Sequence, residues 1–504
     1  MVPSDPRSST VDGVLRRSAG RVPDRTALVF ADRSWTYAEL DAAVSRAAGA
    51  LVGLGLAKGE RVAVYGKNSD AYLIAFLACC RAGLVHVPIN DALRGEELSY
   101  LLTQSGAAAG LVDPLLRKDF DEVAGDLRAV LALRDEPGSL LERSATGPVP
   151  EGRPDVADTD LAQLIYTSGT TSRPKGAMMT HRAIVHEYLS CIVALDFQGS
   201  DVPLHSMPLY HTAQMHVFLM PCLAVGATNH LIETPDIPEI LRRVEAERIT
   251  GLFLAPTVWV PLSNHPDLST RDLTSLRKAF YGASIMPVPV LQRLQGLLPE
   301  LAFYNCFGQS EVAPLAAVLG PAEHEGRLES CGRPVLFVEC QVVDEAGQEV
   351  AAGESGEICY RSPQLCSGYW DKPEETAEAF RDGWFHSGDL VRRDAEGFLF
   401  VVDRIKDVIN TGGVLVASRE VEDALYTHPA VAEVAVIATP DERWIEAVTA
   451  VVVVRGEVSA EELIGHARGR LAGFKVPKRV VFVDSLPRNA SGKLLKRVLR
   501  DSVG

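Results

Sequence analysis

The chain has 504 residues, of which 47% are hydrophobic and 23% are charged, so its length predicts two or more domains around ordinary globular cores. Its formal net charge of −16 argues against a nucleic-acid partner, which needs a basic surface, although a local positive pocket for a nucleotide is compatible with it. No apolar run reaches the roughly 20 residues of a membrane span, and the first residues lack the apolar core of a signal peptide, so we expect a cytoplasmic protein.

Short apolar runs alternate with helical patterns along the first part of the chain. The runs that we expect to be strands lie at 61–66, 84–90, 108–113, 129–133 and 248–256, and the expected helices lie at 70–83 and 288–298. Such alternation is typical of βαβ units. It predicts an α/β fold with mostly parallel sheets and helices on their faces.

The pattern changes after about residue 330. Alternating strands with Gly-rich turns follow at 338–350 and 353–362, which predicts a β-rich subdomain or small barrel. The last hundred residues read as a compact α+β unit with helices at 418–428 and 459–473 and strands at 431–439 and 447–456. We therefore predict a domain at 1–403, with its β-rich part at about 330–403, and a C-terminal cap domain at 404–504.

The nine cysteines show no zinc-ligand spacing, and most of them lie in apolar stretches such as AFLACCRAG. We expect small, buried, reduced thiols and assign them no chemistry.

A loop at 164–176, LIYTSGTTSRPKG, follows a short apolar run and combines hydroxyl residues, glycine and one lysine. These residues form plain solvated turns, and they also bind phosphate through exposed N–H groups, hydroxyls and positive charge. A Walker loop would place Lys after Gly and lead into a helix. Because Lys175 precedes Gly176, an ordinary P-loop kinase is not expected.

This loop resembles the signature of the adenylate-forming family, which comprises acyl-CoA synthetases, peptide-synthetase adenylation domains and luciferases. The other motifs of that family occur in the same order over essentially the whole chain. They are WTYAEL (35–40), the stretch 58–90, PLYHTAQ (208–214), YGASIMP (281–287), YNCFGQSE (304–311), GESGEICYRS (353–362), WFHSGDL (384–390), DRIKD (403–407) and PRNASGK (487–493).

The resemblance implies an ATP-dependent acid–thiol ligase of the acyl-CoA synthetase branch. A carboxylate would attack the α-phosphorus of ATP to give an acyl adenylate and pyrophosphate, and the thiol of coenzyme A would then attack the acyl carbonyl. ATP, Mg²⁺ and coenzyme A are implied, without a prosthetic group. A homodimer is among the assemblies that the sequence leaves open.

Catalysis in the first step should depend on cations and donors, because charge builds on phosphate oxygens. The resemblance assigns Ser310 to the α-phosphate, Glu311 to Mg²⁺, and Lys175 to the phosphates. Lys493 would enter from the cap to bridge carboxylate and phosphate, and His211 would be an aromatic wall between the acyl and nucleotide pockets.

The same resemblance implies a nucleotide site. Asp389 and Arg404 would hold the ribose, Phe307 would stack on adenine, and small residues would let the ligand lie against the backbone. The full set of implied nucleotide-binding residues is Thr167, Ser168, Gly169, Thr170, Thr171, Gly282, Ala283, Ser284, Phe307, Gly308, Asp389 and Arg404. His181 is expected to be structural.

For the second step, the cap would rotate about Lys406, Gly413 would line the pantetheine tunnel, and Trp444 would lie at its wall. The chain departs from the family pattern near these parts of the site. The departing residues are Ser172, where glycine is usual, and Val414, Leu415, Ser418 and Ile445. If they are functional rather than neutral, we expect adenylation to be the weaker half-reaction, because Ser172 touches only that step.

Alternatives remain open at this stage: loading of a carrier protein, a luciferase-like oxidation, or a nucleotide-binding pseudoenzyme. The apolar stretches HTAQMHVFLMP, LFLAPTVWV and YGASIMP predict a mainly hydrophobic carboxylic acid, fatty or bulky, rather than a short diacid such as malonate.

Overall fold

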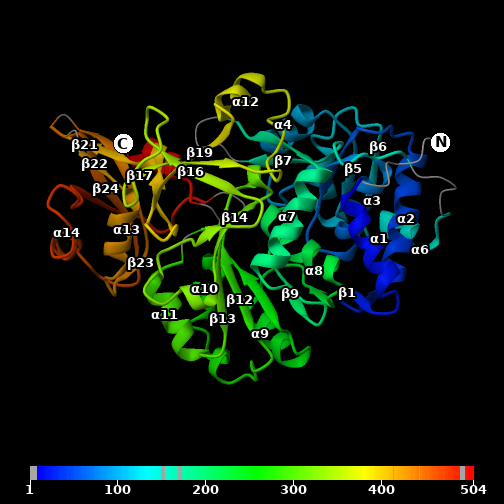
Figure 1. The fold of residues 1–504 in the computed structure, drawn as a ribbon, viewed down its shortest axis with the longest axis horizontal. Helices are drawn as coiled ribbons and strands as arrows, with labels where there is room; N and C mark the ends of the chain where they lie inside the picture. The colour runs from blue at the N-terminus through cyan, green and yellow to red at the C-terminus, as the bar shows by residue number, and fades with distance from the viewer. Residues whose placement is uncertain are drawn as a thin grey trace.

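The computed structural model describes residues 8–148, 154–167, 173–284, 286–412, 414–441, 443–488 and 494–503. Over these ranges the chain is a mixed α/β structure whose strands form four sheets. The two N-terminal sheets occupy the blue-to-green part of the molecule, and the C-terminal sheet lies at its opposite end (Figure 1).

The two N-terminal sheets are mostly parallel, as the alternating pattern predicts. The first has the order β15-β14-β13-β12-β11-β9-β10-β1-β2, and the second has the order β6-β5-β3-β4-β7-β8. The strands of the first sheet are β1 (Thr26–Phe30), β2 (Arg33–Thr36), β9 (Pro203–His205), β10 (Asn229–Leu231), β11 (Gly251–Leu254), β12 (Lys278–Gly282), β13 (Ala302–Gly308), β14 (Leu315–Leu319) and β15 (Arg333–Pro334). Those of the second are β3 (Arg61–Tyr65), β4 (Val85–Ile89), β5 (Ala107–Val112), β6 (Ala129–Ala132), β7 (Leu161–Thr167) and β8 (Lys175–Thr180). Antiparallel pairing is confined to β1–β2, β7–β8 and the β13–β14–β15 edge in the described part of these sheets.

Helices cover these sheets and supply most of the N-terminal core. They are α1 (Val11–Arg21), α2 (Tyr37–Gly53), α3 (Asp70–Ala82), α4 (Gly95–Ser105), α5 (Arg117–Asp121), α6 (Leu140–Thr146), α7 (His181–Ala194), α8 (Met220–Val225), α9 (Ile237–Ala246), α10 (Pro256–Leu262) and α11 (Val288–Leu297). Short turns of other helix types are η1 (Pro114–Leu116), η2 (Ala213–Leu219, a π-helix), η3 (Pro266–Ser269), η4 (Ser310–Val312), η5 (Pro321–Glu323) and η6 (Ile405–Asp407).

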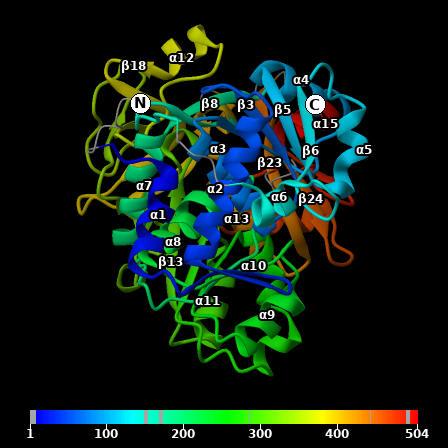
Figure 2. The same cartoon turned by 90° about the vertical axis from the view of Figure 1, so that its right-hand side faces the viewer.

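Helix α3 forms the centre of the N-terminal core. Every residue of it is buried, and α1, α2 and α3 pack side by side (Figure 2). Its ends agree with the sequence: the Ser69 side chain accepts the Tyr72 N–H at the N-terminus, and Gly83 ends the helix at φ 69°. A helix that is apolar on all sides is stable only when it is enclosed, and here the two sheets and their other helices enclose it.

Two smaller, mostly antiparallel sheets follow. The third contains β16 (Glu339–Val343), β17 (Ser355–Arg361), β18 (Phe380–Arg381), β19 (Trp384–Arg393) and β20 (Leu399–Arg404), with α12 (Pro373–Ala379) between β17 and β18. The fourth contains β21 (Ile409–Thr411), β22 (Val414–Val416), β23 (Val431–Asp441), β24 (Ile445–Val454) and β25 (Arg479–Phe482), with α13 (Ser418–Tyr426), α14 (Ala460–Arg468) and α15 (Lys496–Val503). The fourth sheet and α13 and α14 bury a separate apolar cluster, which includes Val421, Val436, Val448 and Leu463.

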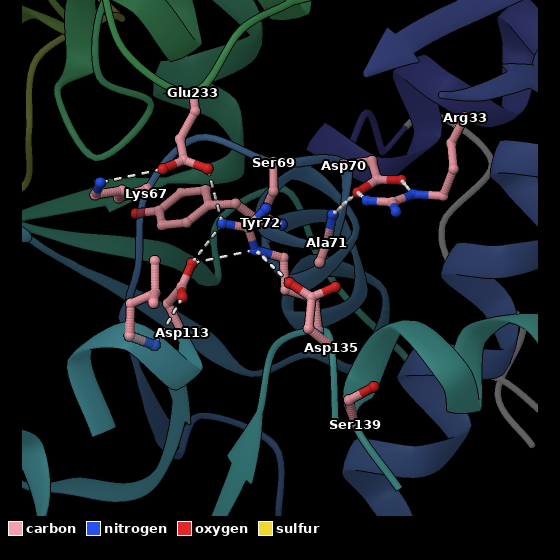
Figure 3. A network of polar contacts seen from close by, with 12 residues as sticks. Arg33, Lys67, Ser69, Asp70, Ala71, Tyr72, Asp113, Asp135, Ser139 and Glu233 are labelled. Atoms are coloured by element: carbon pink, nitrogen blue, oxygen red, sulfur yellow. Dashed lines mark hydrogen bonds and ion pairs between the residues drawn. The ribbon is translucent and has the colours of Figure 1, made fainter. Parts of the chain in front are cut away.

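A partly buried ion-pair network ties the two N-terminal sheets together (Figure 3). Arg134 binds Asp113, which follows β5, at 3.0 Å and Glu233, which follows β10, at 3.1 Å. Lys67, after β3, reaches the same Glu233 at 3.1 Å. Arg134 and Asp113 can be buried where loops of both sheets meet because they pair with each other, whereas Lys67 and Glu233 remain partly exposed.

Each of the nine cysteines is a free thiol, and all are buried except the half-buried Cys340. Over the described ranges, no helix has both the length and the apolar character that crossing a membrane requires.

Candidate active site

The proposed phosphate loop connects the two strands of a β-hairpin. Thr167 ends β7 and pairs directly with Lys175, which begins β8, so both lie at the mouth of the loop. A Walker loop would instead lead into a helix. The structure therefore confirms what the sequence predicts, namely that this loop is not a Walker loop of the kind found in P-loop kinases.

Tyr369 connects this hairpin to Glu311. Its hydroxyl donates to Glu311 Oε1 at 3.1 Å, and the Lys175 Nζ lies 5.0 Å from the centre of its ring. Thr167 Oγ1 donates to the same Glu311 oxygen at 3.2 Å. Burial, and then the Glu311 charge, raise the pKa of Tyr369 well above its usual range, so the phenol keeps its proton and remains a donor.

The Glu311 carboxylate suits a hard cation. It is 9% exposed, and both hydrogen bonds that the described residues donate to it end on Oε1, so that Oε2 points to no described donor. Carboxylate oxygen is the ligand that Mg²⁺ prefers. These residues fit the metal that the motif implies.

The carboxyl ends of three adjacent parallel strands, β11, β12 and β13, form the next part of the site. Gly282 on β12 pairs with Cys306 on β13, and a Cβ at Gly282 would lie 2.1 Å from the Cys306 carbonyl oxygen. At Gly308 a Cβ would lie 1.9 Å from the Pro314 carbonyl oxygen. A side chain at either glycine would therefore collide with the backbone of a neighbouring segment. This is a reason for glycine in addition to the one that the motif implies, which is room for the ligand.

Other predicted residues lie around this strand edge. Ala283 and Ser284 are exposed directly after β12, and Phe307 is half-buried and packs against the second apolar cluster. Ser310 Oγ lies 3.3 Å from Thr212 Oγ1, one residue after His211, so the Ser310 turn contacts the segment of His211. Carboxyl ends of parallel strands are where open α/β sheets bind ligands.

A buried polar cluster supports the turn that carries Ser310 and Glu311. Gln364 Nε2 donates to the Val312 and Leu315 carbonyls at 3.3 and 3.1 Å and to Glu187 Oε2 at 2.5 Å. Glu187 Oε1 accepts the Leu315 N–H at 2.9 Å, and burial raises the pKa of Glu187 well above its usual range. The cluster holds the C-terminal end of the turn and the start of β14.

Asp389 and Arg404 are cross-strand neighbours on β19 and β20. Arg404 Nε lies 3.2 Å from Asp389 Oδ1, and the Asp389 side chain is 8% exposed. The Asp389 carboxylate is therefore oriented by the Arg404 guanidinium and almost enclosed. A carboxylate in this position could accept hydrogen bonds from two hydroxyl groups of a ligand.

The predicted hinge joins the third and fourth sheets. Lys406 is exposed within η6, next to Asp407, which pairs with Arg500 of α15 at 2.5 Å. Asp403 Oδ2 accepts both the N–H and the hydroxyl of Ser418, at 2.6 and 2.7 Å. Proline, which is usual at this position in the family pattern, could not donate that N–H.

The remaining departures lie together beside Trp444, which is half-buried. Thr411 on β21 pairs with both Val414 and Ile445, and exposures are 45% for Val414, 65% for Leu415 and 62% for Ile445. Ile445 has φ 68°, in the left-handed region that favours glycine.

Replacing Ile445 with glycine should stabilise the protein. The left-handed conformation costs a β-branched residue about 1–2 kcal/mol, and glycine gives back about 0.5–1 kcal/mol in backbone entropy. Since Ile445 is mostly exposed, little burial is lost, and the net gain should be about 0.5 kcal/mol. Denaturant unfolding measures it. Ile445→Val keeps the branched side chain and should show no gain; an equal gain there would contradict the strain argument.

Several predicted residues lie outside the described ranges: Ser168, Gly169, Thr170, Thr171, Ser172, Gly413 and Lys493. His181, expected to be structural, is fully buried and accepts the Val11 N–H on Nδ1 at 3.2 Å.

Sequence reasoning missed Tyr369, Gln364 and Glu187. One signal existed for Glu187: it lies on the apolar side of α7 with Ile184 and Cys191, where a charge is unusual. Tyr369 and Gln364 gave no such signal, because the partners that they bind around Glu311 are 49 or more residues away in the chain.

Sequence and structure comparisons place this chain among enzymes of the same kind as the site suggests. A family model described as AMP-binding enzyme matches residues 15–370, and one described as AMP-binding enzyme C-terminal domain matches 420–493. A feruloyl-CoA synthase from Amycolatopsis sp is 39% identical over 97% of this chain and 98% of its own. A medium/long-chain-fatty-acid–CoA ligase from Mycobacterium tuberculosis is 36% identical over 98% of this chain and 90% of its own. The solved anthranilate CoA ligase AuaEII in complex with anthranoyl-AMP superposes with a TM-score of 0.91 at 25% identity, covering 99% of this chain and 98% of that one. The chain therefore belongs to the AMP-binding, adenylate-forming enzyme family and is an ATP-dependent acid–thiol ligase.

Proposed function

We propose that the enzyme joins a mainly hydrophobic carboxylic acid, aromatic or fatty, to coenzyme A through an acyl adenylate. The observation that carries this is the lack of charge in the segments that contain or follow β9, β11 and β12. The segments 202–232, 249–266 and 279–292 contain no Asp, Glu, Lys or Arg. A second carboxylate, as in a short diacid, would be buried there without a cation, which is costly. The named acids of the two curated relatives, ferulate and medium or long-chain fatty acids, support the same class.

In the first half-reaction, Ser310 donates to the α-phosphate while Lys175 and the loop that begins after Thr167 hold the other phosphates. A magnesium ion bound by Glu311 would offset charge on the phosphate oxygens. Asp389 accepts from the ribose hydroxyls, with Arg404 orienting it, and Phe307 lies against adenine. His211 separates the acyl side from the nucleotide side.

The second half-reaction uses a different position of the C-terminal part. We assign residues 1–403 to the body of the enzyme and 404–504 to a cap that turns about Lys406. That turn withdraws Lys493 and brings Gly413 and Trp444 to the thiol channel. The Asp403–Ser418 bonds lie at this joint and support a role for Ser418 in setting the cap's resting position. Because Ser172 replaces glycine in the phosphate loop, adenylation is the slower of the two half-reactions.

A panel of acids tests the proposal. Pyrophosphate release with ATP should be greatest for aromatic and medium-chain acids and small for malonate and succinate, by roughly 10²-fold or more. Coenzyme A should then yield the thioester, faster than adenylation when synthetic adenylate is supplied. Preference for short diacids would refute the substrate class, and transfer to a carrier protein but not to coenzyme A would favour carrier loading.

A further inference from the structure

Three metal-binding side chains lie together on one face of the third sheet, and none of them is assigned to the reaction. Glu357 and Cys359 are two positions apart on β17 and so point to the same side. His386 on β19 pairs directly with Cys359. We propose that Glu357, Cys359 and His386 form a binding site for Zn²⁺ or a similar borderline divalent cation, with a fourth position open to water.

The distances are close to those of a tetrahedral site. His386 Nδ1 lies 2.8 Å from Glu357 Oε2 and 3.3 Å from Cys359 Sγ, and the three ligand atoms lie within 4.8 Å of one another. Zinc bond lengths of about 2.0–2.3 Å imply N–O and N–S separations of about 3.3 and 3.6 Å. Shifts of a few tenths of an ångström would therefore bring the Nδ1–Oε2 and Nδ1–Sγ pairs to these separations, and Oε2 and Sγ lie within 4.8 Å of each other.

The same geometry excludes a catalytic triad. In a triad, one imidazole nitrogen contacts the nucleophile and the other contacts the acid. Here the single nitrogen Nδ1 faces both the thiol and the carboxylate. Three donors converging on one point are the arrangement of a chelate.

The donor set selects the metal. A thiolate, an imidazole and a carboxylate suit Zn²⁺, whereas Mg²⁺ requires oxygen ligands in an octahedron. Arg381 Nη2 opposes any cation, because it lies 3.5 Å from Glu357 Oε2. Its side chain is 47% exposed, and such a contact is weak enough for the guanidinium to move into solvent.

The position of the site connects it to nucleotide binding. Glu357 Oε1 accepts the Gly388 N–H at 2.9 Å, and Gly388 precedes Asp389. A metal on Oε2 would leave that bond in place and fix the part of β19 directly before Asp389. Occupancy should therefore change the affinity for ATP rather than the chemistry.

Cobalt is the probe, because its spectrum reports the ligands. Chelator-treated full-length protein titrated with Co²⁺ should develop a thiolate charge-transfer band and tetrahedral d–d bands that saturate at one ion per chain. Zn²⁺ should remove them, and millimolar Mg²⁺ should not. Cys359→Ala and His386→Asn should each weaken binding by at least about 100-fold. Cys340→Ser, which changes the neighbouring half-buried thiol, should bind as the unmodified protein does.

Circular dichroism and a thermal melt establish that each variant is folded, and His386→Asn gives a second result if the alanine variant is unstable. Absence of a thiolate band in the unmodified protein would overturn the proposal. So would equal metal affinity in a folded Cys359→Ala variant, or a band that disappears only with Cys340→Ser.

Discussion

Replacing Lys493 with alanine should reduce adenylate formation by roughly 10²–10³-fold, the usual effect of removing one preorganised charge donor at an oxyanion. Thioester formation from a supplied acyl adenylate should stay within about twofold, because the role proposed for the lysine is confined to the first step. Pyrophosphate release measures the first rate, and thioester formation from synthetic adenylate and coenzyme A measures the second.

The chain on both sides of Lys493 is anchored, so the variant should fold. Arg488 and Leu494 form a β-bridge, and Leu495 donates its N–H to the Pro487 carbonyl at 2.9 Å. Lys496 then pairs with the half-buried Glu422 at 2.8 Å. Arg497→Ala, at an exposed position of α15, is the matched control and should leave both rates unchanged. Equal losses in both half-reactions of Lys493→Ala would contradict the two positions proposed for the cap.

Much of the fold was predictable because its elements are regular. The expected helix at 70–83 is observed at Asp70–Ala82, and the expected strand at 61–66 is observed at Arg61–Tyr65. Both have strong local signals: a capping serine, a terminal glycine and an apolar run of strand length. The order of strands within each sheet had no such signal, because β9 lies between β10 and β11 only through long-range pairing.

Only those residues of the candidate site that lie in a sequence motif could be predicted. Motifs assign Glu311 and Asp389 to the candidate site from their neighbours in sequence, but they do not indicate which residues hold these side chains in place. Tyr369 reaches Glu311 across 58 positions, and Gln364 reaches Glu187 across 177. Such contacts depend on tertiary packing, which leaves no periodic pattern in a single sequence. Cys359 is the buried free thiol that the sequence predicts, but its contact with His386, 27 positions away, had no signal in the sequence.

Of the described residues, Glu311 should be the one whose substitution reduces the adenylation rate most. Gln at this position keeps the size of the side chain and an oxygen that accepts from Thr167 and Tyr369, but it removes the negative charge. Adenylation should therefore fall by about 10²-fold, and the Mg²⁺ concentration that gives half of the maximal rate should rise. Thioester formation from supplied adenylate should change little.

The Tyr369→Phe variant distinguishes the effect of the Glu311 charge from the effect of how the Glu311 side chain is oriented. It removes the hydroxyl that donates to Glu311 Oε1 at 3.1 Å and keeps the carboxylate. Losing one hydrogen bond to a charged group costs about 1.5–3 kcal/mol at most, and the phenylalanine variant should keep the magnesium dependence of the unmodified enzyme at a lower rate. Initial rates over a magnesium titration, at saturating ATP and acid, give both quantities for each variant. A Glu311→Gln enzyme with unchanged magnesium dependence would show that this carboxylate holds the turn through Thr167 and Tyr369 and does not bind the metal.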